Sequence, residues 1–367
     1  MGDYKFNKMR KLKSIQALRA IAAILVVIDH VFSRVEGLNP GSTLFSEATY
    51  HYLGEIGVQV FFCISGFIMV HTSSGGGGIS DALVFLKKRA IRIYPIYIIT
   101  LLVFVVTVKH FAAAYNINFW VDISDSNVFK RLFLLPTFIY GNGWNNILMQ
   151  SWTLVYEVYF YLVFALCMML VSTKHIPLLA TLFILTVMSV VVFIGGREDS
   201  NTSTYILNVL GSKNLLFFIF GMLVSFAEKH IARKLILINN STLFYSLSVI
   251  LILFSIALTD YVSLYGISIS ILALMYISTI VEINGNNPIN KLMVYLGEAS
   301  YSLYLVHIFA YIASPYFNVI NINNNIYCSL MSVAAIILGC IVHSFIEKPI
   351  VTLLNKSFTY KERKTAA

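Results

Sequence analysis

Long apolar runs separated by short polar segments make up most of the chain. A helix needs about 20 mostly apolar residues to cross the hydrocarbon core of a bilayer, and most of these runs approach that length. The pattern therefore predicts an all-α protein, a polytopic membrane helix bundle with about ten transmembrane helices. The expected spans are residues 14–33, 54–72, 90–108, 150–171, 177–195, 214–227, 243–259, 262–281, 297–317 and 326–346.

Lys and Arg residues are concentrated in alternate connections between the expected spans. Cytoplasmic loops of membrane proteins carry an excess of Lys and Arg, and an even number of spans puts both termini on one side. We therefore expect both termini in the cytoplasm. Residues 1–350 are expected to form the membrane domain, and residues 351–367 a charged cytoplasmic tail.

Composition supports a membrane protein and excludes a soluble binding module. Of the 367 residues, 58% are hydrophobic and 12% are charged, whereas soluble domains carry roughly 25% charged residues. Cytoplasmic loops account for the net charge of +9, so nucleic acid is not an expected partner. The four Cys residues lie in or beside apolar runs without a Cys-x-x-Cys pair, which predicts neither a disulfide framework nor a metal site.

Ionisable side chains inside an apolar span are functional candidates, because they cost free energy in lipid and usually face the bundle interior. The first span holds Arg19, Asp29 and His30. Arg19 and His30 lie on one helix face, three turns or roughly 16 Å apart. Asp29 points about 100° away from His30, so it either orients His30 through a kink or meets another helix. A lone intramembrane His can also serve only as a hydrogen-bond partner between helices.

Two arginines, Arg89 and Arg92, lie at the start of the third span, one turn apart on the same helix face. Two guanidinium groups at the mouth of a membrane bundle suit a phosphorylated ligand. Anchoring to anionic lipid headgroups explains the pair equally well. The residue types alone leave both interpretations open.

Two further spans carry polar residues. The fourth opens with Trp152 and reaches Glu157, which needs an Arg or His from another span, either for structural pairing or for catalysis. In the ninth span, Ser300, Tyr304 and His307 follow one another at spacings of four and three and share one helix face. This polar stripe either lines a cavity or holds neighbouring helices together.

Five motifs, in this order and spacing, resemble the acyltransferase-3 family of integral membrane acyltransferases, and most of all its exopolysaccharide and O-antigen O-acetyltransferases. The resemblance runs from about residue 14 to residue 350. The motifs are Ile15-Gln-Ala-Leu-Arg19 followed by His30, Gly57-Val-Gln-Val-Phe-Phe-Cys-Ile-Ser-Gly66, Arg89-x-x-Arg92-x-Tyr-Pro95, Ser151-Trp152-Thr-Leu-x-x-Glu157 and Ser300-Tyr-Ser-Leu-Tyr304-Leu-Val-His307.

The resemblance implies an O-acetyltransferase of the bacterial inner membrane with acetyl-CoA as donor. The implied acceptor is a sugar hydroxyl of a surface polysaccharide (O-antigen, capsule or exopolysaccharide) or of its undecaprenyl-linked precursor. The membrane lipid is the other expected partner, and no metal cofactor is expected. The family's Arg-x10-His motif falls on Arg19 and His30, and its Arg-x-x-Arg motif falls on Arg89 and Arg92.

The mechanism expected on this basis makes His30 the general base, with Asp29 or Glu157 orienting it and stabilising the imidazolium. The residues expected to bind acetyl-CoA are Arg19, Arg89 and Arg92. The residues expected to line the substrate cavity are Trp152, Ser300, Tyr304 and His307. His343 and Glu347, four residues apart at the end of the tenth expected span, are expected to have a structural role. His51, His71 and His110 lie in or near the expected loops, His175 and His230 flank spans, and these five histidines receive no role.

Three alternatives stay open at this point. A covalent acetyl-enzyme is possible chemistry, with the acetyl group carried by His30 or by a serine such as Ser302. Another acyl-CoA donor would bind through the same CoA head. A transporter or flippase of a lipid-linked glycan also fits a bundle of about ten spans with buried charges, and it would move its substrate without consuming acetyl-CoA.

Overall fold

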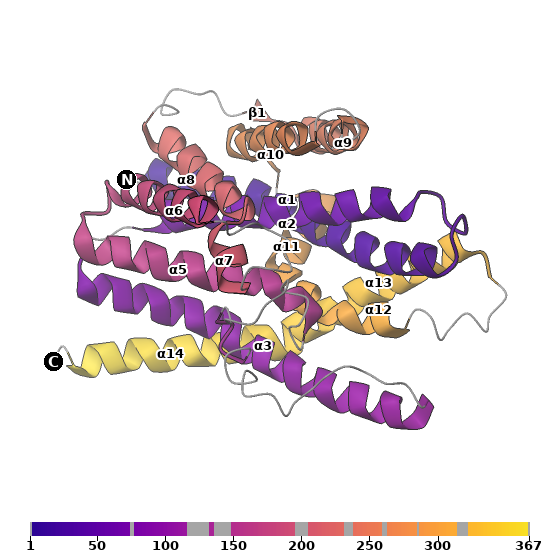
Figure 1. Cartoon of the computed structure of the whole chain (residues 1–367). Coiled ribbons are helices and arrows are strands. Elements are labelled where there is room, and N and C mark those ends of the chain that lie inside the picture. Colours follow the sequence, from indigo (N-terminus) through magenta and orange to yellow (C-terminus); the bar gives the residue numbers. More distant parts are fainter. Residues whose placement is uncertain are drawn as a thin grey trace. The chain divides into compact units, whose positions relative to one another are not determined.

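The computed structural model describes residues 2–73, 77–115, 132–135, 148–194, 205–230, 238–258, 263–284, 286–313 and 322–365. Over these residues the chain is almost entirely helical (Figure 1). The helices are α1 (Gly2–Leu38), α2 (Glu47–Thr72), α3 (Ile79–Tyr115), α5 (Trp152–Leu170), α6 (Ile176–Phe193), α7 (Tyr205–Leu210), α8 (Asn214–His230), α9 (Ser241–Leu258), α10 (Ser263–Ile280), α11 (Pro288–Val306), α12 (Ile308–Ala313), α13 (Asn324–Val342) and α14 (Lys348–Thr365). Strands β1 (Ile238–Asn239) and β2 (Val281–Glu282) pair in parallel, with Ile238 opposite Val281.

Seven helices within the described residues are long and apolar enough to cross a membrane. They are Lys13–Leu38, Glu47–Thr72, Ile79–Val108, Met149–Leu170, Ile176–Phe193, Ile206–Glu228 and Asn324–Ser357. The pair Pro288–Glu298 and Ser300–Ala310, bent by 61°, passes the same test as one span, and two shorter apolar helices cover Ser241–Ile256 and Ser268–Ile280. The expected all-α polytopic bundle is thus confirmed, whereas the number of ten spans and the cytoplasmic termini stay predictions.

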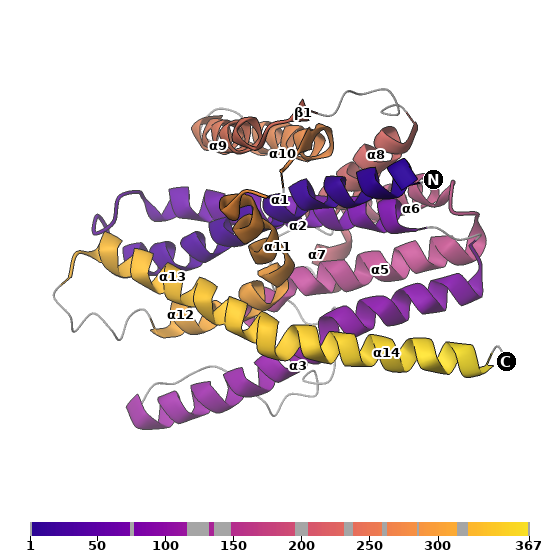
Figure 2. The ribbon, with the colours of Figure 1, turned by 180° about the vertical axis from the view of Figure 1, so that it is seen from behind.

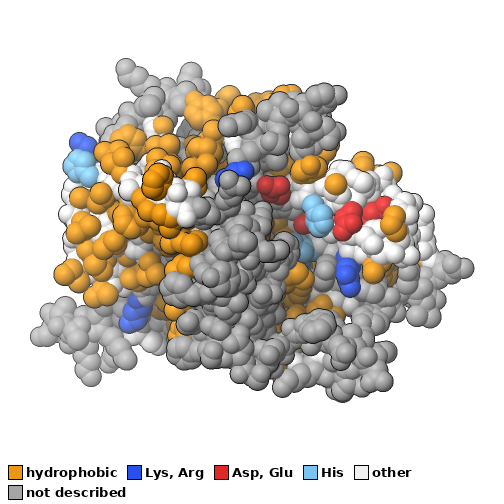
Figure 3. Space-filling model, viewed as in Figure 1, with side chains coloured by type: hydrophobic (Ala, Val, Ile, Leu, Met, Phe, Trp, Pro, Cys, Tyr) orange, Lys and Arg blue, Asp and Glu red, His pale blue; other side chains and the backbone are white. Residues whose placement is uncertain are grey.

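Large apolar side chains stay exposed on many of these helices, for example Leu102 on α3, Leu178 on α6 and Leu253 on α9. Figure 3 shows hydrophobic side chains spread over much of the described part of one face. A protein surrounded by water rarely exposes so much contiguous apolar surface. The exposed positions are therefore the ones that would contact lipid.

The chain divides into two compact units. The first contains Met1–Thr72 and Leu216–His343, and the second contains Ser73–Leu215 and Ser344–Ala367. In the first unit α1 packs against α2, α10, α11 and α13, and in the second α3 packs against α5 and α14 (Figures 1 and 2). The boundary at residue 350 that the sequence suggests falls inside α14, which is one continuous helix.

Glycines allow α2 and α11 to approach α1 closely. A Cβ atom at Gly57 of α2 would press on the backbone of Ala22, and a Cβ atom at Gly297 of α11 would overlap the carbonyl group of Gln16. Small residues at helix contacts are the usual means of close packing within membranes. The contact of Gly297 with Gln16 therefore lets the backbones of α11 and α1 approach closely.

Candidate active site

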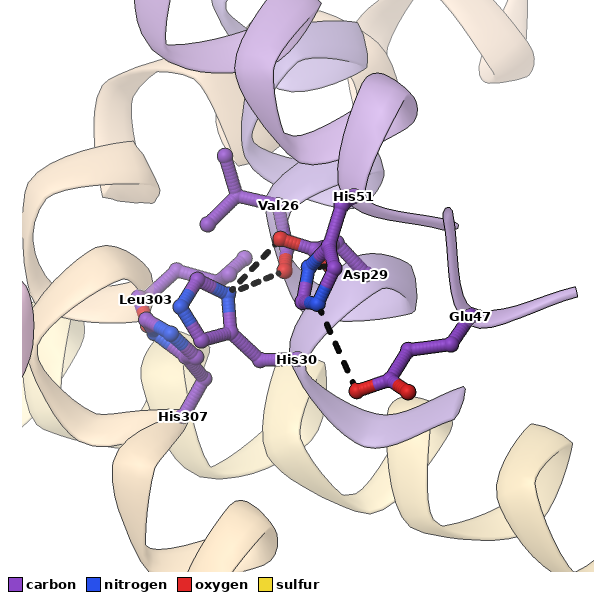
Figure 4. Close-up of polar contacts among 7 residues, drawn as sticks. All are labelled: Val26, Asp29, His30, Glu47, His51, Leu303 and His307. Carbon is purple, nitrogen blue, oxygen red and sulfur yellow. Dashed lines mark hydrogen bonds and ion pairs between the residues drawn. The ribbon is translucent and has the colours of Figure 1, made fainter. Parts of the chain in front are cut away.

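Several ionisable side chains lie close together in the first unit (Figure 4). They come from the second half of α1, the beginning of α2 and the end of α11. His30 extends from α1, and its Nδ1 lies 2.9 Å from the carbonyl oxygen of Val26 in the preceding turn. A carbonyl oxygen only accepts, so Nδ1 donates this hydrogen bond. In neutral His30 the lone pair is therefore on Nε2, the nitrogen that acts as a base.

Asp29 lies between two histidines. Its Oδ2 is 3.6 Å from Nδ1 of His30, and its Oδ1 is 3.0 Å from Nδ1 of His51. The sequence directs Asp29 about 100° away from His30, but the structure shows that the carboxylate reaches back to its neighbour while also meeting α2. The Asp29 side chain is 9% exposed, and the His51 side chain is 60% exposed. The buried carboxylate thus has one partner that faces inward and one that faces outward.

His307 is fully buried beside His30. The two ring centroids are 4.9 Å apart and the rings are inclined at 65°. Nδ1 of His307 lies 3.3 Å from the carbonyl oxygen of Leu303, to which it donates, and its Nε2 has no hydrogen-bond partner among the described residues. Leaving a buried acceptor unpaired costs roughly 1–3 kcal/mol. Such a nitrogen is typical of a site that works on a ligand rather than of a core.

The remaining candidates of the first unit lie on the same two helices. Arg19 is buried, and its Nη1 lies 3.2 Å from Oε1 of Gln16. The ring of Tyr304 is 5.7 Å from the ring of His307. Ser300 is fully buried, and its Oγ has no hydrogen-bond partner among the described residues. Gly297 packs on Gln16 and His307 packs on His30, so α11 meets α1 at two places along its length.

The other candidates belong to the second unit. The guanidinium carbon of Arg89 is 5.3 Å from the ring centroids of both Phe85 and Tyr161, at the separation of cation–π contacts. Glu157 and Arg92 both interact electrostatically with Arg89. The carboxylate of Glu157 on α5 therefore has an Arg of α3 near it, the kind of partner that a carboxylate within a membrane span requires.

Trp152 lies at the start of α5, where its ring packs against the ring of Tyr156, with the centroids 5.7 Å apart. Of the two carboxylates expected beside His30, Asp29 is the one for which the structure gives a contact with it. His30 and Glu157 lie in different compact units. Within the described residues no group of three or more His, Cys, Asp or Glu side chains is arranged to hold a metal ion.

His51 is one of the histidines for which the sequence predicts no role. The apolar run predicted a helix from residue 54, but α2 begins at Glu47, so His51 lies in its first turns. Polar first turns carry no apolar periodicity and look like a loop. The feature of the sequence that indicates a helix here is the i, i+4 spacing of Glu47 and His51, which is typical of a helix surface.

Comparison with known families matches residues 12–345 to a family model described as an acyltransferase domain. The chain therefore belongs to the acyltransferase-3 family, and the resemblance of its five motifs to this family is confirmed. It is also 29% identical over 275 residues to the exopolysaccharide production protein ExoZ of Rhizobium meliloti (strain 1021), an alignment that covers 72% of this chain and 80% of that protein. No solved structure shows a significant match.

Proposed function

We propose that the protein is an O-acetyltransferase that moves an acetyl group from acetyl-CoA to a sugar hydroxyl of a bacterial surface polysaccharide or of its undecaprenyl-linked precursor. Family membership supports acyl transfer. The name of the relative, a protein of exopolysaccharide production, supports a polysaccharide acceptor over a small soluble one. The apolar helices support a membrane location, which we assign to the bacterial inner membrane because acetyl-CoA is made in the cytoplasm.

The observation that carries this proposal is the geometry of His30. Its Nδ1 donates to the Val26 carbonyl, so in the neutral ring Nε2 carries the lone pair. During transfer, Nε2 takes the proton of the sugar hydroxyl while the hydroxyl oxygen attacks the thioester carbonyl. The carbon–sulfur bond then breaks, and the imidazolium returns the proton to the thiolate. Asp29, 3.6 Å from Nδ1, stabilises the imidazolium between these two steps.

The arginines of both units are assigned to the donor. Guanidinium groups form strong charge-assisted hydrogen bonds with phosphates, and CoA carries its phosphates at the end remote from the thioester. We assign Arg89 and Arg92 to these phosphates and Arg19 to the pantetheine arm. The spacing of Arg89 and Arg92, one turn apart on α3, supports this assignment, because side chains at this spacing lie on the same helix face.

The test is release of the CoA thiol from acetyl-CoA by the purified protein, with lipid-linked glycans as acceptor. His30→Ala removes the base and is expected to lower the rate by roughly 10²–10⁴-fold. His175→Ala removes an exposed histidine at the start of α6 and is expected to leave the rate unchanged. Full activity of His30→Ala would refute the assignment of the base. Movement of the glycan without any thiol release would favour a transporter instead.

A further inference from the structure

One face of α2 forms a cradle for the Asp29 carboxylate. Glu47, His51 and Gly54 follow one another at spacings of four and three, so they lie on the same side of the helix. A Cβ atom at Gly54 would overlap the carboxylate of Asp29, so only glycine leaves room for that carboxylate. His51 lies one helix turn before Gly54, and its Nδ1 is 3.0 Å from Oδ1 of Asp29. Glu47 lies one turn before His51, and its Oε1 is 3.6 Å from Nε2 of His51.

We propose that His51 is a positioning residue for the base, acting through Asp29. By holding Oδ1 it turns Oδ2 of Asp29 toward Nδ1 of His30, which is 3.6 Å away (Figure 4). This inference rests on the proposed role of His30. It adds a residue that lies on another helix and that no motif of the sequence identified.

The geometry explains why Asp29 needs such a partner. Asp29 and His30 are adjacent on α1, so helical geometry alone directs their side chains about 100° apart. The carboxylate must bend toward His30, and a free carboxylate would rotate toward water or toward other donors. His51 and the space above Gly54 hold it in the productive orientation. Glu47 in turn restrains the imidazole of His51, whose side chain is otherwise 60% exposed.

The role predicts a particular kinetic signature. His51 and Asp29 act on the charge that develops on His30 during transfer, and not on the bound donor. Loss of an interaction made only in the transition state lowers kcat and leaves KM unchanged. His51→Ala is therefore expected to lower kcat about tenfold, the lower end of what loss of a hydrogen-bond partner of a functional histidine costs in metal sites. The KM for acetyl-CoA is expected to stay the same.

Two matched variants separate positioning from folding. His51→Asn keeps a side-chain N–H donor near the position of Nδ1 and is expected to recover most of the kcat. Gly54→Ala leaves His51 intact but fills the place of the carboxylate, so it is expected to lower kcat as His51→Ala does. In a His30→Ala background neither change is expected to lower the residual rate further, because residues that act as one unit are not additive.

A second readout does not depend on acyl transfer. Diethyl pyrocarbonate acylates unprotonated imidazole nitrogens, and the rate at each histidine can be followed by peptide mass spectrometry of the full-length protein. The carboxylate beside Nδ1 makes Nε2 of His30 more nucleophilic. His51→Ala is expected to slow modification of His30 severalfold, and His51→Asn to restore it, while His175 reacts at an unchanged rate.

The two readouts also separate the inference from the proposed function. Absence of acyl transfer in the wild-type protein would refute the function, and the modification rates would still decide whether His51 positions Asp29. An unchanged kcat in His51→Ala, a rise in KM alone, or an unchanged modification rate of His30 would each overturn the positioning role.

Discussion

At the scale of single residues, hydrogen bonds to the helix backbone decide which nitrogen of each imidazole can react. Both His30 and His307 donate from Nδ1 to the carbonyl four residues earlier, which leaves both Nε2 atoms with lone pairs. The site is therefore suited to remove a proton from a hydroxyl group and then to hold the resulting imidazolium next to Asp29.

Replacing Asp29 with Asn keeps the shape of the side chain and removes its charge. In the proposed function this charge stabilises the imidazolium of His30, so kcat is expected to fall by roughly a hundredfold with little change in KM for acetyl-CoA. Steady-state kinetics of thiol release measure both quantities. Asp81→Asn, which changes a carboxylate that accepts from the backbone N–H of Gly77, serves as control, and an equal loss in that variant would contradict the argument.

Replacing His307 with Leu tests whether its unpaired nitrogen is functional. Leu has a similar volume and no polar atom, so the change removes an unmet buried acceptor that costs roughly 1–3 kcal/mol. The Tm in detergent is expected to stay the same or rise, while acetyl transfer is lost. Such a trade-off is typical of functional sites. A variant that is destabilised and still active would show that His307 serves packing alone.

At the scale of elements, the position of the site depends on how closely α11 approaches α1. Gly297→Val places a branched side chain where the carbonyl group of Gln16 lies, and overpacking of this kind costs about 1–3 kcal/mol or more. We expect a clear fall in Tm, measured by thermal unfolding in detergent. Leu330→Ala, at an exposed position of α13, is expected to change Tm little. Equal Tm values for the two variants would contradict the tight contact.

Apolar runs predicted the helices well and their ends poorly. The first two spans, expected at 14–33 and 54–72, lie inside the observed apolar helices Lys13–Leu38 and Glu47–Thr72. Helices continue past the bilayer-length run into polar turns, where hydrogen bonding rather than hydrophobicity maintains them. His51 was missed for this reason. In α11, the expected stripe from Ser300 to His307 ends as the helix ends, and His307 occupies its C-cap.

Contacts between helices could not be predicted from the sequence. Spacing along α1 placed Arg19 and His30 on one face, since that relation is local. The contacts of His30 with His307 and of Asp29 with His51 depend instead on helices that meet through Gly57 and Gly297. A single sequence does not show which residues of one helix lie opposite which residues of another. The order and spacing of the motifs therefore identified the candidate residues without showing which of them are in contact.

At the scale of the whole molecule, the candidate residues are shared between the two compact units. His30, Asp29 and His307 belong to the first unit, and Arg89 and Arg92 belong to the second. In the proposed function, His30 acts at the thioester, whereas Arg89 and Arg92 bind the phosphates of CoA. Binding of CoA and chemistry at the thioester are then separable by mutation.

Arg92→Gln is expected to raise KM for acetyl-CoA roughly tenfold, because a charge-assisted hydrogen bond to phosphate is lost. The same variant is expected to use S-acetyl-pantetheine, which has no phosphate, as well as the wild-type protein does. The ratio of kcat/KM values for the two donors measures this directly. Lys88→Gln, at an exposed position of α3, is the control. An unchanged ratio in Arg92→Gln would favour the alternative that the arginine pair anchors the protein to lipid.

The exposed imidazole of His51 also makes it possible to determine which side of the membrane this part of the site faces. Its side chain is 60% exposed at the start of α2, next to the connection from α1. If the N-terminus lies in the cytoplasm, that connection faces the periplasm, and a membrane-impermeant reagent should modify His51 in spheroplasts but not in sealed inverted vesicles. The labelling pattern would then show which side of the membrane the first turns of α2 and the neighbouring Asp29 face.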